Sequence, residues 1–200
     1  WLPTFFLLPL YNVSSFLDLF ISSGNDHEIK FDRNEERDIH DLFSKYKPHI
    51  ILNNNEELKG KIILNEFGIS DNDKFVCLIV RDNFYLNRHN NYLSKDYSQS
   101  DYRNGNIDRY ILAAEELANR GYYVFRMGMN GIKPFNTNNK RIIDYANTKL
   151  RSDFMDVYLG SKCSFCISTG SGFDAIPYIF RKPIAYIQQT IGVLHTERES

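Results

Sequence analysis

The hydrophobic positions change their pattern near residue 73. From Lys74 onward, short apolar runs alternate with amphipathic stretches of helical length. The apolar runs predict strands at 74–81, 122–127, 141–144, 163–168 and 183–187, and the amphipathic stretches predict helices at 107–120, at 153–159 and from Phe173. Near-continuous apolar runs are typical of strands covered on both faces. This order predicts an α/β fold, a Rossmann-like doubly wound parallel sheet with helices on both faces.

The residues before this point follow a different pattern, in which helices are expected at 13–20, 35–45 and 56–67. The apolar stretch at 1–21 is interrupted by Pro3, Pro9 and Asp18, whereas a membrane helix needs roughly 20 uninterrupted apolar residues. The chain begins with Trp1 and ends in a polar run, so we expect a piece of a longer protein. We predict a partial, mostly helical N-terminal region at 1–72 and a Rossmann-like domain at 73–200, with the polar turn at 70–73 as the boundary.

Composition narrows the class of protein. A net charge of -1 over 200 residues provides no broad attraction for nucleic acid or an anionic membrane. Three cysteines do not form a disulfide framework in a chain of this length. Cys163 and Cys166 lie three apart in an expected strand, where they would face opposite sides of the sheet, and no second Cys or His pair accompanies them. We therefore expect buried free thiols, no metal and a reducing, cytoplasmic compartment.

The turn from Ser168 to Phe173 connects an expected strand to an expected helix. The free N–H groups and the dipole of a helix start favour an anion at such a position. Gly170 and Gly172 would let a phosphate approach the backbone, and Thr169 and Ser171 add hydroxyl donors. The turn therefore predicts a binding site for a nucleotide diphosphate.

Other polar residues follow the remaining strands. Ligands of open α/β sheets bind beyond the carboxyl ends of the strands. The residues expected at this edge are Arg81 and Asp82 after the first strand, Arg126 and Gly128 after the second, Asp144 and Tyr145 after the third, and Gln188 and Gln189 after the fifth. Two arginines beside the turn would supply permanently charged donors to a diphosphate, although each could equally form a surface salt bridge.

Acidic residues supply the candidates for catalysis and for sugar binding. Asp82 is the expected general base, and a plain salt bridge to Arg81 is the alternative. Asp153 and Asp156 lie at i and i+3 near the start of one helix, where they either favour the helix terminus or hold ribose or sugar hydroxyls; Asp153 is the candidate ligand. The polar, tyrosine-containing stretch at 82–106 is expected to be a functional loop.

The segment from Gly170 to Ala175 also fits the dinucleotide fingerprint G-x-G-x-x-A. That fingerprint should follow the first strand of its unit, with an acidic residue about 20 positions later. The following strand ends in Ile187, Gln188 and Gln189, so the acid is missing. We rank a dinucleotide-dependent oxidoreductase below an enzyme that uses a sugar nucleotide. The sequence contains no P-loop, G-x-S-x-G or H-E-x-x-H motif.

Three stretches together carry a resemblance to a known family. They read KFVCLIVRDNFYL, DYRNGNIDRYILAAEELANRGYYVFRMG and IIDYANTKLRSDFMDVYLGSKCSFCISTGSGFDAIPYIFRKPIAYI. Over about residues 37–190 the chain resembles a family of bacterial proteins classed as glycosyltransferases of surface polysaccharide synthesis. That family looks like the GT-B class, with two facing Rossmann-like domains, and is distantly similar to fucosyltransferases. One departure is that Ile79 stands where the family has a histidine two residues before its motif arginine.

The resemblance implies a glycosyltransferase that moves a sugar from a nucleotide-sugar donor to a glycan or lipid-linked acceptor. Arg81 would contact the donor diphosphate, and the turn Thr169–Phe173 would be the phosphate-binding turn. Residues 73–200 would then be the donor-binding half of a GT-B fold. The expected enzyme needs no metal and no cofactor, binds no nucleic acid, and lies in the cytoplasm or at the inner face of the membrane. A degenerate copy that binds sugar or nucleotide without turnover is the alternative.

Overall fold

The computed structural model describes residues 45–82, 104–129 and 133–187. Contacts divide the chain into one unit up to Tyr46 and another from Lys47. The predictions for the helix at 13–20, for most of the helix at 35–45, for the loop tyrosines and for Gln188 and Gln189 lie outside the described residues. The partial N-terminal domain and the connection of residues 1–44 to it therefore stay predictions.

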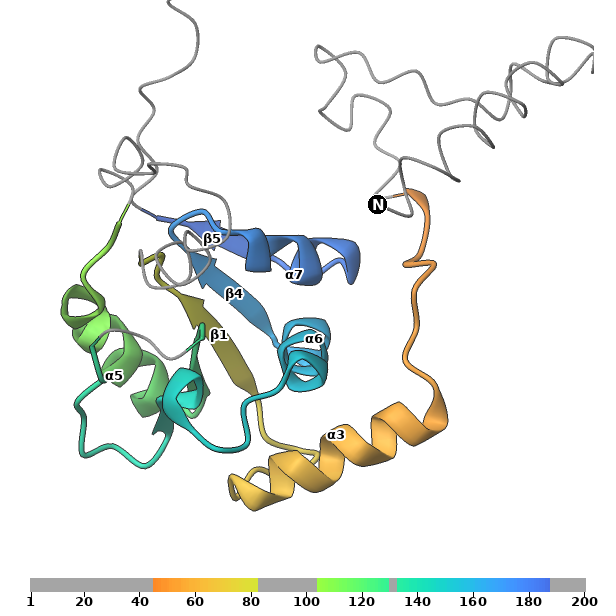
Figure 1. Cartoon of the computed structure of the whole chain (residues 1–200), viewed down its shortest axis with the longest axis horizontal. Coiled ribbons are helices and arrows are strands. Elements are labelled where there is room, and N and C mark those ends of the chain that lie inside the picture. Colours follow the sequence, from red (N-terminus) through yellow and green to blue (C-terminus); the bar gives the residue numbers. More distant parts are fainter. Residues whose placement is uncertain (1–44, 83–103, 130–132, 188–200) are drawn as a thin grey trace, which may run out of the picture. The chain divides into compact units, whose positions relative to one another are not determined.

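The centre of the described unit is a five-stranded parallel sheet (Figure 1). Its strands are β1 (Phe75–Ile79), β2 (Tyr123–Met127), β3 (Ile142–Ile143), β4 (Phe165–Ser168) and β5 (Ile184–Tyr186), in the order β3-β2-β1-β4-β5. Every neighbouring pair is parallel. The chain moves outward from β1 through β2 to β3 and then returns to the other side of β1. This order matches the first five strands of the Rossmann order 3-2-1-4-5-6, and the predicted α/β class is confirmed.

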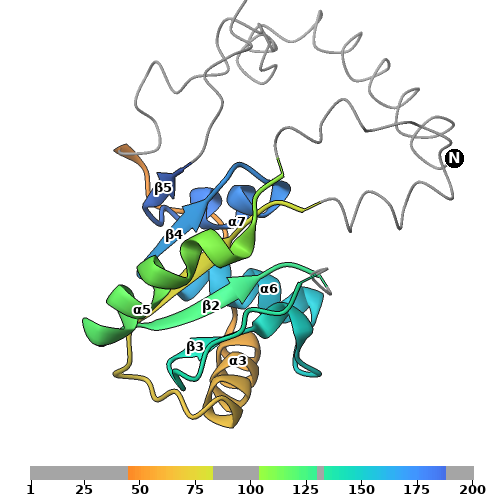
Figure 2. The ribbon, with the colours of Figure 1, turned by 90° about the vertical axis from the view of Figure 1, so that its left-hand side faces the viewer.

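Helices cover both faces of the sheet, as Figure 1 and Figure 2 show. On one face α3 (Asn54–Glu66) and α6 (Asp153–Lys162) pack over one hydrophobic cluster, and on the other α5 (Ile111–Asn119) packs over a second. The side chains of β1 alternate between the two clusters: Phe75, Cys77 and Ile79 enter the first, and Leu78 enters the second. This alternation explains why the whole strand is apolar.

Short helical turns complete the connections. The 3₁₀ turn η5 (Ile107–Tyr110) leads into α5, η6 (Tyr145–Asn147) follows β3, and η7 (Gly172–Asp174) leads into α7 (Ala175–Ile179). All five predicted strands are present, each shorter than expected. The helix expected at 107–120 begins as a 3₁₀ turn, whose start Asn106 caps by accepting a hydrogen bond from the backbone N–H of Asp108. No helix of the described residues is long and apolar enough to cross a membrane.

Helix α3 belongs to the same compact unit as the sheet. Asn53 caps its start in a capping box with Glu56, and Leu64 lies in the core cluster that also contains Phe75. A Cβ atom at Gly60 would overlap the ring of Tyr158 on α6, so the two helices meet at this glycine. The boundary expected after residue 72 therefore does not separate α3 from the sheet among the described residues.

The cysteines correct one detail of the predicted strand. Cys163 is not in β4 but caps the end of α6, where its N–H donates to the carbonyl of Leu159. Cys77, Cys163 and Cys166 all lie in the same core cluster, so Cys163 and Cys166 do not face opposite sides of the sheet. The prediction of buried free thiols is confirmed for all three. Burial raises the pKa of the Cys166 thiol well above its ordinary value, which leaves it protonated and unreactive.

Candidate functional site

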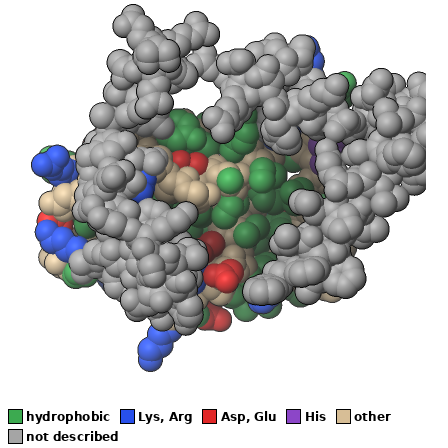
Figure 3. All heavy atoms as spheres, turned by 45° about the horizontal axis from the view of Figure 1, so that its top comes forward, with side chains coloured by type: hydrophobic (Ala, Val, Ile, Leu, Met, Phe, Trp, Pro, Cys, Tyr) green, Lys and Arg blue, Asp and Glu red, His purple; other side chains and the backbone are tan. Residues whose placement is uncertain are grey.

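A pocket of about 840 Å³ lies at the carboxyl ends of the strands. At this point the connection after β1 leads to one side of the sheet and the connection after β4 leads to the other. This is the switch point at which open α/β sheets bind their ligands. Among the residues predicted from the sequence, the pocket is lined by Arg81, Asp82, Arg126, Gly128, Gly170, Ser171, Gly172 and Phe173. Figure 3 turns the top of Figure 1 toward the viewer and shows hydrophobic and acidic side chains gathered in the described part of this face.

Two hydrogen bonds fix the first strand end against its neighbours. The backbone N–H of Arg81 donates to Oγ1 of Thr169 at 2.9 Å, which ties the end of β1 to the end of β4. The carbonyl of Arg81 accepts from the N–H of Gly105 at 2.9 Å. The described residues on either side of 83–103 thus lie side by side at the pocket. The backbone of Arg81 is thus held on two sides.

Ser168 and Thr169 shape the turn and do not line the pocket. Both are buried, with Oγ of Ser168 accepting from the N–H of Gly170 and Oγ1 of Thr169 accepting from Arg81. Of the two hydroxyls expected as donors to a phosphate, that of Thr169 is thus an acceptor within the protein, and Ser171 lines the pocket. Gly170 adopts a φ of 87°, in the region that favours glycine.

The start of the helix after the turn already carries a negative charge. Ser171 and Asp174 form a capping box, in which the N–H of Ser171 donates to Oδ2 of Asp174 at 2.9 Å. Asp174 is 7% exposed and lines the pocket. Its carboxylate accepts a hydrogen bond from one of the N–H groups that were predicted to bind an anion. The helix α7 that follows has only five residues, so its dipole is short. The turn therefore has fewer hydrogen-bond donors for a phosphate than its sequence indicated. The backbone around Gly172 and Phe173 is the part that remains.

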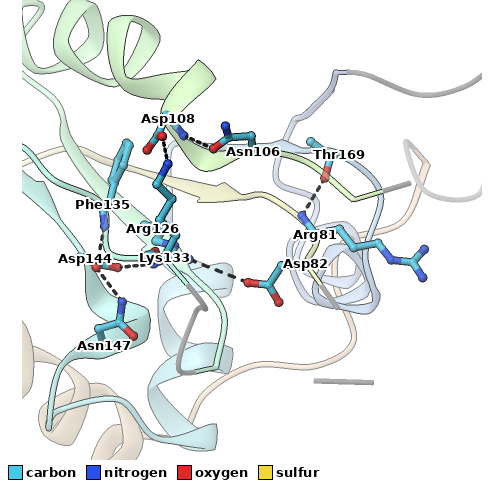
Figure 4. Close-up of polar contacts among 10 residues, drawn as sticks. All are labelled: Arg81, Asp82, Asn106, Asp108, Arg126, Lys133, Phe135, Asp144, Asn147 and Thr169. Atoms are coloured by element: carbon cyan, nitrogen blue, oxygen red, sulfur yellow. Dashed lines mark hydrogen bonds and ion pairs between the residues drawn. The ribbon is translucent and has the colours of Figure 1, made fainter. Parts of the chain in front are cut away.

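Arg126 is held in a network of protein acceptors, which Figure 4 shows. Its side chain is 5% exposed, and Nη1 donates to the carbonyl of Lys133 at 2.8 Å and to Oδ1 of Asp144 at 2.9 Å. Nη2 lies 4.0 Å from Oδ2 of Asp82. Its charge is thus matched by two carboxylates before any ligand arrives, and the acid that approaches Arg126 is the predicted general base.

The two arginines do not converge as the sequence predicted. In Figure 4 the Arg81 side chain extends away from Arg126, although both residues line the pocket. Asp144 lies outside the pocket lining, because its second oxygen accepts from the N–H of Phe135 at 3.0 Å and from Nδ2 of Asn147 at 2.8 Å. Asp144 is a partner of Arg126 and not a ligand contact. Arg81, whose backbone N–H donates to Thr169, is the predicted arginine that is tied to the turn.

Tyr145 and Asp153 also lie outside the pocket lining. Tyr145 is fully buried, where its hydroxyl meets the backbone of Ser152 and lies 2.9 Å from Oδ1 of Asp156. Asp153 is 92% exposed and pairs with Nη2 of Arg151 at 2.9 Å. The sequence could not distinguish Asp153 from Asp156, and the structure selects Asp156, which lines the pocket.

Sequence reasoning missed several lining residues, of which Arg151 and Asp174 carry charge. Arg151 and Asp156 form an ion pair of 2.6 Å. Burial raises the pKa of Asp156 above its ordinary value, while the hydrogen bonds from Tyr145 and Arg151 oppose the rise. Asp156 stands three and four residues before the buried Leu159 and Gly160, so it lies on the buried face of α6.

The lining therefore balances charge. Its ionisable groups among the described residues, apart from one tyrosine, are three arginines and three aspartates: Arg81, Arg126, Arg151, Asp82, Asp156 and Asp174. Apolar side chains form much of the remaining wall, including Ile79, Met127 and Ile176. Such a lining suits a ligand that has both anionic groups and hydroxyls. No group of His, Cys, Asp or Glu side chains that could hold a metal ion is found within 45–82, 104–129 and 133–187.

Comparison with protein-family models, with curated proteins and with solved structures finds no match to this chain.

Proposed function

We propose that the chain binds a nucleotide-sugar in the switch-point pocket and transfers the sugar to a hydroxyl of a glycan or lipid-linked acceptor. The observation that supports this most is the meeting of the β1 end, with Arg81 and Asp82, and the glycine-rich turn after β4 in one pocket. Its volume of about 840 Å³ lies within the range of roughly 300–1,000 Å³ found for small-molecule sites. In this proposal residues 73–187 belong to the donor-binding half of a GT-B fold.

The donor diphosphate lies against Arg81 and the backbone of Gly172 and Phe173. A guanidinium and backbone N–H groups neutralise the charge that develops on the diphosphate as the bond to the sugar breaks. Asp82 accepts the proton of the attacking acceptor hydroxyl. Arg126, whose own charge is matched by Asp144, holds the Asp82 carboxylate at the pocket edge.

A second candidate is a protein that binds the same ligand without turnover. Ile79 lines the pocket and is 7% exposed. In the family that the chain resembles, this position carries a histidine. An apolar side chain at this position can neither donate a hydrogen bond nor transfer a proton. This protein would bind nucleotide-sugars with the same residues and release them unchanged.

Titration of the full chain with UDP-, GDP- and CMP-linked sugars tests the shared requirement of both candidates. We expect saturable binding of at least one of them, and a loss of about tenfold to a hundredfold in affinity for Arg81→Ala, because a charge-assisted contact to phosphate is removed. Arg109→Ala is the matched control, since Arg109 is exposed and lies outside the pocket lining. Absence of binding by all the sugars would refute the proposal, and release of the free nucleotide (UDP, GDP or CMP) with an acceptor present separates the enzyme from the binding protein.

A further inference from the structure

One part of the pocket wall is a guanidinium–carboxylate pair that the proposed reaction does not use. Nη2 of Arg151 lies 2.6 Å from Oδ2 of Asp156, and both residues line the pocket. Behind them, Oδ1 of Asp156 lies 2.9 Å from the hydroxyl of Tyr145. That hydroxyl is itself fixed by the backbone of Ser152, whose N–H donates to it at 3.2 Å. The orientation of the Asp156 carboxylate is therefore set from two sides.

The pair keeps unused hydrogen-bonding capacity. Nε of Arg151 is buried and has no hydrogen-bond partner among the described residues. Buried polar groups are usually satisfied, and a bound group with an acceptor would satisfy this N–H. Each oxygen of Asp156 accepts one hydrogen bond, whereas a carboxylate can accept about four in total. The wall thus presents donors and acceptors next to each other.

Charge decides what such a wall can bind. An anion placed beside it would meet the carboxylates of Asp153 and Asp156, which already flank Arg151 at 2.9 and 2.6 Å. A cation would meet the guanidinium of Arg151. A hydroxyl is neutral, donates one hydrogen bond and accepts two, and so matches a carboxylate and a guanidinium at once. Two neighbouring hydroxyls match both oxygens of the carboxylate.

We propose that Arg151 and Asp156 form a hydroxyl-binding subsite, which recognises a vicinal diol of the ribose or the sugar. The inference rests on the proposed function, in which Arg81 and the turn hold the phosphates of the same ligand. Asp156 accepts from the hydroxyls, and Arg151 donates to their oxygens. The subsite binds the hydroxylated part of the ligand. Because the charges of Arg151 and Asp156 cancel, phosphate binding falls to Arg81 and the turn.

Asp156→Asn tests the subsite in the full chain against three kinds of probe. These are a nucleotide-sugar, inorganic pyrophosphate, and hydroxylated compounds without phosphate, namely uridine, guanosine and a free monosaccharide, each titrated separately. We expect the affinity for the nucleotide-sugar to fall about tenfold to a hundredfold, because bonds to a charged acceptor are lost. The affinity for pyrophosphate should stay the same or rise, since a negative charge is removed. Asp153→Asn is the matched control, because it removes the other partner of Arg151 without touching the pocket lining.

The outcomes separate this inference from the proposed function. If nucleotide-sugars bind and Asp156→Asn binds them like the wild type, the subsite is refuted and the proposed function stands. If they do not bind, but the nucleoside or monosaccharide binds and depends on Asp156, the proposed function fails and the subsite stands. If none of the hydroxylated probes binds the wild type, both fail. Should Asp156→Asn unfold, Arg151→Lys keeps the charge but lacks Nε, and unchanged nucleotide-sugar affinity in that variant also refutes the subsite.

Discussion

The role of each arginine at the pocket depends on the carboxylates around it. Arg126 donates to Asp144 and approaches Asp82, so little of its charge is left for a ligand. Removing one partner of such a buried pair leaves the other charge uncompensated, which costs about 3–5 kcal/mol of folding stability. Substitutions at Arg126 would therefore confuse stability with binding. Arg81 is the better position for a binding test, because the contacts that fix it to β4 and Gly105 are made by its backbone.

At the residue scale, Tyr158 predicts how stability depends on pH. Burial raises the pKa of Tyr158 from 10.0 to about 12, and the nearby carboxylates of Glu57 and Asp71 add to the rise. A raised pKa means that the protonated hydroxyl is favoured in the folded state. This contribution to stability is complete below pH 10 and is lost as the pH rises through about 12.

Thermal unfolding between pH 8 and pH 12 checks this prediction. The melting temperature of Tyr158→Phe should match the wild type near pH 8 and fall less steeply between pH 10 and pH 12. Tyr178→Phe is the control, because Tyr178 is 47% exposed. Equal slopes for Tyr158→Phe and the wild type would contradict the assigned environment of Tyr158.

Single residues show where the sequence was informative and where it was not. Arg81 and Asp82 could be predicted at the pocket because they directly follow an apolar run, and a strand end has one place in a parallel sheet. Tyr145 could not be placed, because η6 turns the chain after β3 and carries its ring into the core. The choice between Asp153 and Asp156 depends on how α6 is rotated against the sheet, which neither spacing nor composition determines.

At the scale of elements, α6 packs against two residues of the pocket wall at Gly160. A Cβ atom at Gly160 would lie 2.6 Å from Cγ2 of Ile176 and 3.3 Å from Cζ of Phe173, and both of these residues line the pocket. Gly160 thus permits the close packing that sets the position of η7 and α7. Gly60 plays the same packing role on the other side of α6, where α3 meets Tyr158 away from the pocket.

Comparison of Gly160→Ala with Gly60→Ala tests this coupling. Each variant overpacks a contact of α6, so each should lose about 1–3 kcal/mol of stability. Gly160→Ala should also weaken nucleotide-sugar binding, because Phe173 and Ile176 must move, whereas Gly60→Ala should bind like the wild type at temperatures where it is folded. Chemical unfolding and titration measure the two effects separately. Equal affinities in both variants would show that α6 does not position the turn.

The elements themselves could be predicted well, and their ends less so. β1 is buried at every position and therefore stands out in the sequence as an uninterrupted apolar run. The prediction that Cys163 starts a strand was wrong, because its apolar side chain enters the core equally well from the end of α6. The capping box of Ser171 with Asp174 and its effect on the anion site required the geometry.

At the scale of the whole molecule, the central claim is that the switch point between β1 and β4 holds a diphosphate against the turn. The fold explains the position of the pocket, since the strand order alone places two diverging connections there. It does not explain Gly172. A Cβ atom at this position would meet nothing within 4 Å, and the residue lacks the positive φ found at Gly170. Protein packing therefore permits any small residue at 172, whereas a phosphate that approaches the backbone requires glycine.

The most direct test compares the wild type with Gly172→Ala in two measurements. One is the melting temperature, and the other is the affinity for a nucleotide-sugar that the wild type binds. The account predicts an unchanged or slightly higher melting temperature, because alanine restricts the unfolded chain without strain in the folded one. It also predicts a loss of affinity of about tenfold or more, since the added methyl group occupies the space of the diphosphate. A variant that folds like the wild type and binds the nucleotide-sugar with undiminished affinity would contradict the placement of the diphosphate at this turn.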